Sequence, residues 1–142
     1  MTYQMIYSSQ ATAAMSIADL EEILVDARTG NEKRKVTGVL VYVDGVFLQI
    51  LEGEEQALRT LMRSIASDSR HTNVKVFYEA EVDRPIFTSW RMAYLSATPQ
   101  QMAAWAGLEG TATSIDSVLE DIYREPQRGS TVVESLLRAL VA

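Results

Sequence analysis

The stretch VTGVLVYVDGVFLQILEG, residues 36 to 53, predicts a β-hairpin. Two runs of β-branched and other apolar residues meet at Asp44-Gly45, a pair that is typical of two-residue hairpin turns. In the second run, residues 47, 49 and 51 face one side of the sheet and residues 46, 48 and 50 face the other. Both sets are apolar apart from Gln49, so we expect both faces of the sheet to be covered.

The residues before the hairpin predict one strand and one helix. The strand covers residues 2–9, and the helix begins after Ser16, whose spacing from Asp19 is typical of a capping box. Apolar residues then recur at helical spacing, and Gly30 is expected to end the helix. One face of the strand carries Tyr3, Met5 and Tyr7.

The residues after the hairpin predict a second helix and two more strands. The helix covers residues 54–69, and the strands cover residues 73–82 and 89–96, with Pro85 in the loop between them. The chain therefore runs β-α-β-β-α-β-β. This order predicts an α+β, ferredoxin-like sheet with one added strand and with both helices on one face. The inward stripe of the second helix is Leu58, Leu61, Met62 and Ile65.

Residues 97–142 are expected to form a helical extension to the unit made by residues 1–96. A Thr-Pro pair, with Gln101 completing a capping box, begins the first helix of this extension. Apolar stripes in residues 113–125 and 131–142 predict two more helices, which could pair as a helical hairpin. Because both faces of the sheet are apolar, the extension, a second subunit, or both should cover the face away from the two main helices.

Composition excludes several kinds of site. The chain of 142 residues has 47% hydrophobic and 23% charged residues, so one domain with a full core is expected. Its net charge of -6 argues against binding to nucleic acid. It has no cysteine and a single histidine, His71, so we expect no metal site. Without a signal peptide or an apolar stretch of about 20 residues, we expect a cytoplasmic protein that does not enter a membrane.

Gln49 is a polar residue inside an apolar strand and needs a hydrogen-bond partner. An unpaired buried amide costs about 1–3 kcal/mol. If the strand at residues 2–9 lies beside the second strand of the hairpin, Tyr7 comes within reach, and a hydroxyl and an amide can satisfy each other. Taken alone, this pair is explained by a structural bond in the core. Taken alone, Asn31 is explained as a helix cap and residues 68–73 as a solvated turn.

Taken together, these residues resemble the BLUF family of blue-light sensors, which hold a flavin non-covalently. The resemblance covers about residues 3–96. Ala27 and Gly30 depart from some relatives, which have polar residues at these positions. The resemblance is carried by Tyr7 in IYSS, Asn31 with the following VTGVL, Gln49 in FLQILEG, the turn SRHTNV at residues 69–74, and Trp90 with Met92 in SWRM.

The resemblance implies a cofactor and the residues that hold it. FAD is the expected flavin, with FMN and riboflavin as further candidates, and its ring would lie between the two helices. Gln49 would bond to Tyr7 and to the ring near its N5 and C4 carbonyl, and Asn31 would bond to the pyrimidine edge. Candidates for the ring faces are Ile23, Phe47 and Ile65, and candidates near the ribityl chain and outer ring are Asp68, Arg70 and His71.

The resemblance also implies a mechanism. After blue light excites the flavin, Tyr7 would give it an electron and then a proton through Gln49, whose amide would settle in a new arrangement. A new hydrogen bond to the C4 carbonyl would shift absorption to the red. Met92 and Trp90 would relay the change to the extension.

No catalytic motif is present in residues 97–142, so we expect a photoreceptor rather than an enzyme. Its signal would pass to a separate effector protein or through a homo-oligomer. By analogy with small members of the family, that effector could be an enzyme of cyclic-di-GMP turnover.

Two other functions are compatible with this scaffold. A small-ligand or protein-interaction module without photochemistry would leave the apolar pocket unexplained. A hydrolase of the acylphosphatase kind needs an arginine in the loop after the first strand. The sequence SSQATAAMS at residues 8–16 contains none.

Overall fold

The computed structural model describes residues 2–88, 90–108, 110 and 114–141. Met1, Ser89, Thr113 and Ala142, which belong to predicted segments, lie outside the described residues. No helix in the described ranges has both the length and the apolar character needed to cross a membrane. In chain order the elements are β1 (Thr2–Ala11), α1 (Ile17–Arg34), β2 (Thr37–Val43), β3 (Val46–Gly53), α2 (Glu55–Ala66), β4 (His71–Val82), β5 (Ala93–Ser96), α3 (Pro99–Trp105), α4 (Ile115–Arg124) and α5 (Arg128–Val141).

The strands form one sheet in the order β4-β1-β3-β2-β5. β2 and β3 make the predicted antiparallel hairpin, and the turn residues Asp44 and Gly45 have φ values of 44° and 81°. Both values lie in the left-handed region that this two-residue turn requires. β1 runs antiparallel to β3 and places Tyr7 opposite Gln49, while β5 runs parallel to β2 at one edge. The predicted α+β, ferredoxin-like sheet with one added strand is confirmed.

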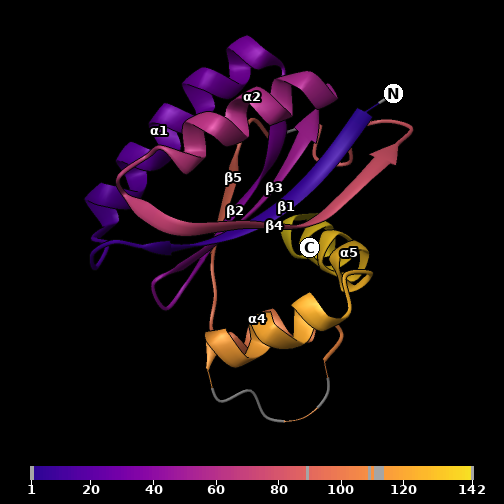
Figure 1. Cartoon of the computed structure of the whole chain (residues 1–142). Coiled ribbons are helices and arrows are strands. Elements are labelled where there is room, and N and C mark those ends of the chain that lie inside the picture. The colour runs from indigo at the N-terminus through magenta and orange to yellow at the C-terminus, as the bar shows by residue number, and fades with distance from the viewer. Residues whose placement is uncertain (1, 89, 109, 111–113, 142) are drawn as a thin grey trace.

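Figure 1 shows the sheet between two helical layers, with α1 and α2 on one face and the extension on the other. Strand residues alternate between these layers, as their parity predicted. Under α1 and α2 lie Met5, Tyr7, Phe47 and Leu51. The face against the extension forms a second cluster, called here the extension cluster. It includes Ile6, Val41, Leu48 and Ile50, with Met102, Ile122 and Leu136 from the three helices of the extension. The chain's own extension therefore covers the second face.

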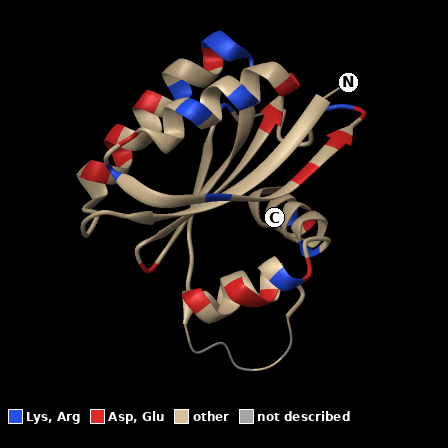
Figure 2. Ribbon diagram, viewed as in Figure 1, with Lys and Arg blue, Asp and Glu red and all other residues tan. Residues whose placement is uncertain are grey.

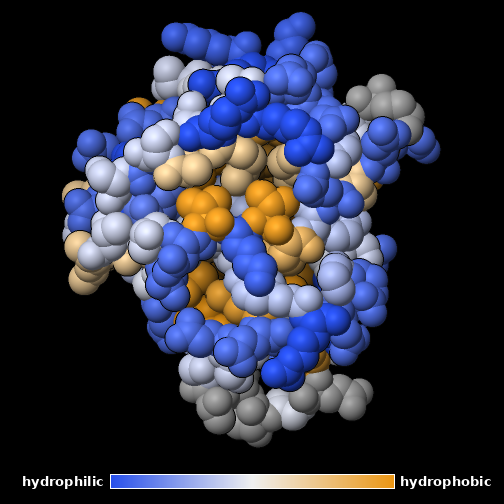
Figure 3. Space-filling view, viewed as in Figure 1, coloured by the Kyte–Doolittle hydropathy of each residue, from blue (hydrophilic) through white to orange (hydrophobic). Residues whose placement is uncertain are grey.

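Within the extension, α3 contacts both α4 and α5. The two later helices contact α3 more extensively than they contact each other, so the predicted helical hairpin is not the main packing. α4 is amphipathic: Ile122 is buried, whereas Asp116 and Glu120 are exposed among the acidic residues visible along this helix in Figure 2. In the same view, Figure 3 shows apolar side chains gathered where the sheet meets the extension.

The end of α1 differs from the prediction. The helix continues through Gly30 to Arg34 and ends at Lys35, which adopts the left-handed conformation with φ of 57°. Asn31 therefore lies in the last turn of α1 and is not a residue beyond it. Gly30 has a different use, because a Cβ there would lie 2.5 Å from Nη1 of Arg34. The missing side chain makes room for the guanidinium group.

The last strand is shorter than predicted. β5 begins at Ala93, so Trp90 and Met92 lie in the loop before it. In the predicted strand of residues 89–96, alternation would place Trp90, Met92 and Tyr94 on one face; this is wrong, because irregular backbone does not keep the two-residue alternation of a strand. Trp90 packs against the extension cluster, and Met92 and Tyr94 belong to the cluster under α1 and α2. β4 and α5 also begin earlier than predicted, at His71 and Arg128.

The covering role of the extension predicts an unequal effect of two identical substitutions. Ile122→Ala should destabilise the protein by about 2–5 kcal/mol, since it removes a fully buried side chain that packs in the extension cluster. Ile17→Ala is the matched control, because Ile17 is 78% exposed. It should change the free energy of unfolding by about 0.5 kcal/mol or less. Urea unfolding measures both values, and equal effects would contradict the covering role.

Candidate functional site

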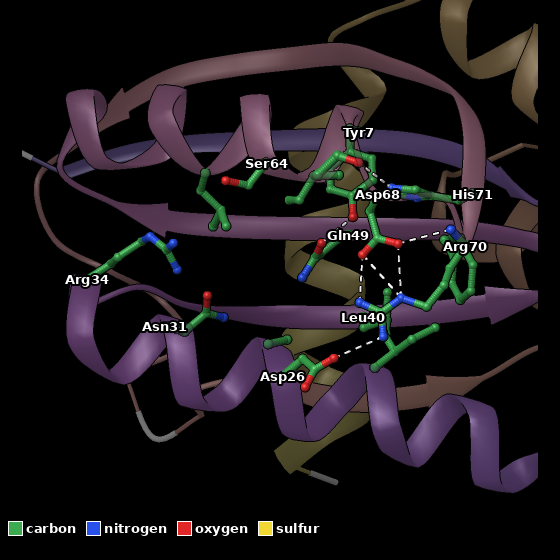
Figure 4. Close-up of a pocket in the computed structure, with 15 residues that line it drawn as sticks. Tyr7, Asp26, Asn31, Arg34, Leu40, Gln49, Ser64, Asp68, Arg70 and His71 are labelled. Carbon is green, nitrogen blue, oxygen red and sulfur yellow. Dashed lines mark hydrogen bonds and ion pairs between the residues drawn. The ribbon is translucent and has the colours of Figure 1, made fainter.

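A cavity opens between α1, α2 and the sheet (Figure 4). Its walls surround about 830 Å³ of empty space, counted out into the open solvent at its mouth. Every residue predicted to contact the flavin lies in its wall. The lining residues are Tyr7, Ile23, Asp26, Ala27, Asn31, Arg34, Leu40, Phe47, Gln49, Leu61, Ser64, Ile65, Asp68, Arg70 and His71.

Gln49 is bonded on both ends of its amide. The Tyr7 hydroxyl donates to Oε1 of Gln49, and Nε2 of Gln49 lies 3.2 Å from Sδ of Met92, which accepts from it. The antiparallel register of β1 and β3 puts Tyr7 and Gln49 on the same face, directly opposite each other. Met92 reaches them from the loop before β5. The pairing of Tyr7 with Gln49 that the strand order predicted is therefore present.

The Tyr7 phenol is neutral in this setting. Its side chain is buried, and this burial raises its pKa well above the usual range for tyrosine. The negative charge of Asp68 raises the pKa further. Tyr7 therefore keeps a proton that it can donate to Gln49 across the physiological pH range.

Asn31 is buried in the last turn of α1 and aims at the cavity. Its Nδ2 donates to the backbone carbonyl of Arg91 at 2.9 Å, which ties α1 to the loop before β5. Figure 4 shows its Oδ1 directed into the cavity, and this oxygen has no partner among the described residues. The predicted role of a helix cap is wrong, since the amide bonds across the fold rather than to its own helix. Asn31 offers a ligand one hydrogen-bond acceptor.

Arg34 is a lining residue that the sequence pattern missed. Its guanidinium points into the cavity from the end of α1, and it has no ion-pair partner among the described residues. It lies one helical turn after Asn31, so both side chains emerge on the same face. That spacing would have identified Arg34 if the helix had been predicted to continue past Gly30.

One edge of the cavity is closed by ion pairs. Arg70 lies 2.6 Å from Asp68 and 3.0 Å from Asp26, measured between Nη2 or Nη1 and the carboxylate oxygens. These contacts join the turn after α2 to α1. The hydrogen bond from Arg70 lowers the pKa of Asp68, which keeps that carboxylate charged. Asp68 and Arg70 were predicted at the site, whereas Asp26 was missed.

His71 forms a fixed part of the wall. Its Nε2 lies 2.6 Å from the carbonyl oxygen of Ile65, and its Nδ1 lies 2.7 Å from Oγ of Ser9. Since a carbonyl oxygen can only accept, Nε2 carries a proton, and the Ser9 hydroxyl can donate to Nδ1. The imidazole packs edge-on against Tyr7 and Phe47, with ring centroids 6.3 Å and 6.1 Å apart. Both nitrogens are therefore engaged within the protein.

The cavity has the chemistry of a flavin site. A flat, largely apolar ring fits between the apolar side chains of α1, α2 and β3, which include Ile23, Ile65 and Phe47. The polar edge of such a ring needs both donors and acceptors, and the free Oδ1 of Asn31 and the unpaired guanidinium of Arg34 supply one of each. The residues present fit the group that the sequence predicted.

The raised pKa of Tyr7 predicts how stability depends on pH. Above about pH 10, the ordinary pKa of tyrosine, the unfolded chain loses this proton while the folded protein keeps it. The unfolded state then binds fewer protons, so stability falls by about 1.4 kcal/mol per pH unit from this group. Tyr7→Phe should remove that part of the slope. Urea unfolding at about pH 9 and about pH 11 measures it, and an unchanged slope would contradict the buried neutral phenol.

Comparison with known proteins agrees with this geometry. A family model for BLUF, described as sensors of blue light using FAD, matches residues 2–93. The beta subunit of the photoactivated adenylate cyclase of Euglena gracilis is 34% identical over 131 residues, which cover 92% of this chain and 15% of that protein. The dark-state structure of the BLUF protein BlrB superposes with a TM-score of 0.70 and 26% identity, covering 98% of this chain and 94% of that one.

A second solved structure with a similar fold belongs to a longer protein. A complex of Klebsiella pneumoniae BlrP1 with manganese and cyclic di-GMP has a TM-score of 0.62 and 26% identity, covering 84% of this chain and 28% of that one. The chain spans about 15% of the length of the curated Euglena relative, so the similarity there concerns one part of a larger protein. The family match, by contrast, covers more than half of this chain. The chain belongs to the BLUF family of blue-light sensors, whose cofactor is FAD.

Proposed function

We propose that Tyr7 and Gln49 are the pair through which this sensor responds to blue light, and that the response passes to a separate effector protein. The observation that carries the proposal is the continuous bond from the Tyr7 hydroxyl through the Gln49 amide to Met92, in the wall of the cavity. Residues 1–96 form the flavin-binding unit in this proposal, and residues 97–142 form the output extension.

When bound, the flavin supplies a ring that absorbs blue light and can accept an electron. Tyr7, neutral before the light reaction, would give the ring an electron; the oxidised phenol would then release its proton to Oε1 of Gln49, and the amide would pass a proton on to the ring. The amide of Gln49 has one donor end and one acceptor end, so exchanging them changes the hydrogen bonds without moving the backbone. Nε2 can leave Met92 at little cost, since thioether sulfur is a weak acceptor.

The remaining predicted residues position the ring. Ile23 and Ile65, from the two helices, and Phe47, from β3, line the cavity where they can contact its faces. Asn31 bonds its pyrimidine edge through the free Oδ1, and Arg34 supplies a positive charge. At the other edge Asp68, Arg70 and His71 meet the outer ring and ribityl chain. FMN and riboflavin share this ring and are further candidates beside FAD.

Met92 and Trp90 are the proposed relay. Met92 accepts from Gln49 under α1 and α2, whereas Trp90 packs beside Phe87 in the cluster shared with the extension, with ring centroids 6.3 Å apart. Two positions of one short loop thus touch opposite sides of the sheet. A second link lies behind Tyr7, because the hydroxyl of its neighbour Ser8 shares a hydrogen bond with the hydroxyl of Tyr123 in α4.

The effector is proposed to be an enzyme of cyclic-nucleotide metabolism, acting as a separate partner. Two similarities support this class: the Euglena relative is a subunit of an adenylate cyclase, and BlrP1 was solved with cyclic di-GMP. A cyclic-di-GMP turnover enzyme remains the first candidate. A homo-oligomer of this chain is the alternative output, and light scattering in darkness and under blue light distinguishes the two.

The photochemical roles predict the behaviour of three variants. The purified protein should be yellow, and its flavin absorption should shift slightly to the red under blue light and recover in darkness. Tyr7→Phe and Gln49→Leu should each keep the flavin and lose the shift. Tyr3→Phe is the matched control, because Tyr3 shares the strand face but bonds to the exposed Glu79. A normal shift in Tyr7→Phe would refute the donor role, and one in Gln49→Leu would refute the switch role.

The relay predicts a separation of photochemistry from output. Blue light should change the hydrogen-exchange rates of backbone amides in α3, α4 and α5. Trp90→Ala should keep the absorption shift and lose this change in exchange, because the indole next to Met92 in the loop no longer packs against the extension cluster. Mass spectrometry of peptides from the extension measures it. Exchange that still responds to light in the variant would exclude Trp90 as the relay.

A further inference from the structure

Glu52 is a fully buried carboxylate that the flavin site does not use. It lies three residues after Gln49 on β3, on the opposite face of the sheet. Its Oε1 accepts from the backbone N–H of Phe87 at 2.7 Å, and its Oε2 accepts from the backbone N–H of Ile86 at 2.8 Å. Two side chains also donate to it: Gln4 Nε2 at 2.9 Å and Thr37 Oγ1 at 3.3 Å.

The four donors satisfy the side chain of Glu52 completely. Each of its oxygens receives two donors, which fills the acceptor capacity of a carboxyl group. No basic side chain pairs with Glu52 among the described residues, so amide, hydroxyl and backbone donors alone satisfy its buried oxygens.

The two backbone donors belong to the loop between β4 and β5, whose far end reaches the flavin site. Two backbone bonds continue from Phe87: the Phe87 carbonyl accepts from Trp90 N–H, and the Trp90 carbonyl accepts from Gly38 N–H at 3.2 Å. The next two carbonyls, of Arg91 and Met92, accept from Asn31 at 2.9 Å and from Arg28 at 3.1 Å. A series of hydrogen bonds therefore connects Glu52 with the part of the loop that contacts Asn31 and Gln49.

We propose that Glu52 is a positioning residue for the light response. Its carboxylate anchors one end of this loop to β3, and the side chain of Gln49 on the same strand meets Met92 at the other end. Both ends of the loop are thus attached to β3, one through Glu52 and the other through Gln49, on opposite faces of the sheet. Loss of the anchor would let Met92 Sδ move away from Gln49 and would weaken the dark arrangement of its amide. This inference rests on the proposed role of Gln49.

The first test uses the wild-type protein and needs no photochemistry. The amides of Ile86 and Phe87 should exchange with solvent at least about tenfold more slowly than those of Arg84 and Thr88, whose backbone N–H groups have no acceptor among the described residues. Hydrogen exchange followed by NMR in darkness measures each rate. Equal rates would overturn the anchor even if the protein responds normally to light.

The second test replaces the carboxylate by an amide of the same size. Glu52→Gln keeps one acceptor oxygen and places an NH2 group against the other backbone donor, so exchange at one of the two amides, Ile86 or Phe87, should accelerate at least about tenfold. The absorption shift should persist, and its recovery in darkness should slow at least about threefold, because Met92 no longer holds Nε2 of Gln49. Wild-type values for exchange or for recovery would overturn the proposal.

Gln4→Met is the matched control. It removes one donor from the same carboxylate but leaves both backbone bonds of the loop intact. Its exchange at Ile86 and Phe87 and its dark recovery should stay within about twofold of wild type. Effects as large as those of Glu52→Gln would show a general loss of packing and overturn the positioning role. If the wild-type protein itself shows no red shift, the photochemical proposal fails, while the exchange measurements still decide whether Glu52 anchors the loop.

Discussion

A hydrogen bond between the side chains of two neighbouring strands holds the polar centre of this protein. Tyr7 on β1 and Gln49 on β3 face each other in antiparallel register, and each satisfies the other inside an apolar face. Without this bond, the unpaired buried amide would lower the free energy of unfolding by about 1–3 kcal/mol. The same burial keeps the phenol protonated. A structural requirement of the sheet thus creates a pair that can exchange a proton.

The two faces of the sheet differ: one borders the cavity, and the other is covered by the helices of the extension. The three helices of the extension pack on Ile6, Val41, Leu48 and Ile50 and exclude water from that side. The opposite face then keeps open space between α1 and α2, lined by apolar side chains with polar groups at its edges. β3 serves both layers, since it carries Gln49 toward the cavity and Glu52 toward the other side. β3 therefore contacts side chains of both layers.

Local patterns in the sequence predicted most of the fold. The Asp44-Gly45 turn, the capping boxes at Ser16 and Thr98, and the alternation of β3 each depend on residues close together in the chain. The errors occurred where a local signal was overridden. Gly30 was taken as a helix end, yet α1 continues to Arg34 and ends at Lys35, which adopts the left-handed conformation.

The amino-acid sequence by itself determined the strands, the hairpin turn and the two-sided apolar sheet, because periodicity and turn chemistry act over short distances. It predicted the pairing of Tyr7 with Gln49, which are 42 positions apart, only on the condition that the first strand lies beside the third. Only the tertiary structure decided how the loop before β5 splits Trp90 from Met92, and which groups surround them. Bonds such as Asn31 to Arg91, Arg70 to Asp26 and Glu52 to Phe87 join residues 35 to 60 positions apart. Such contacts follow from the packing of whole elements, and no local pattern of residues encodes them.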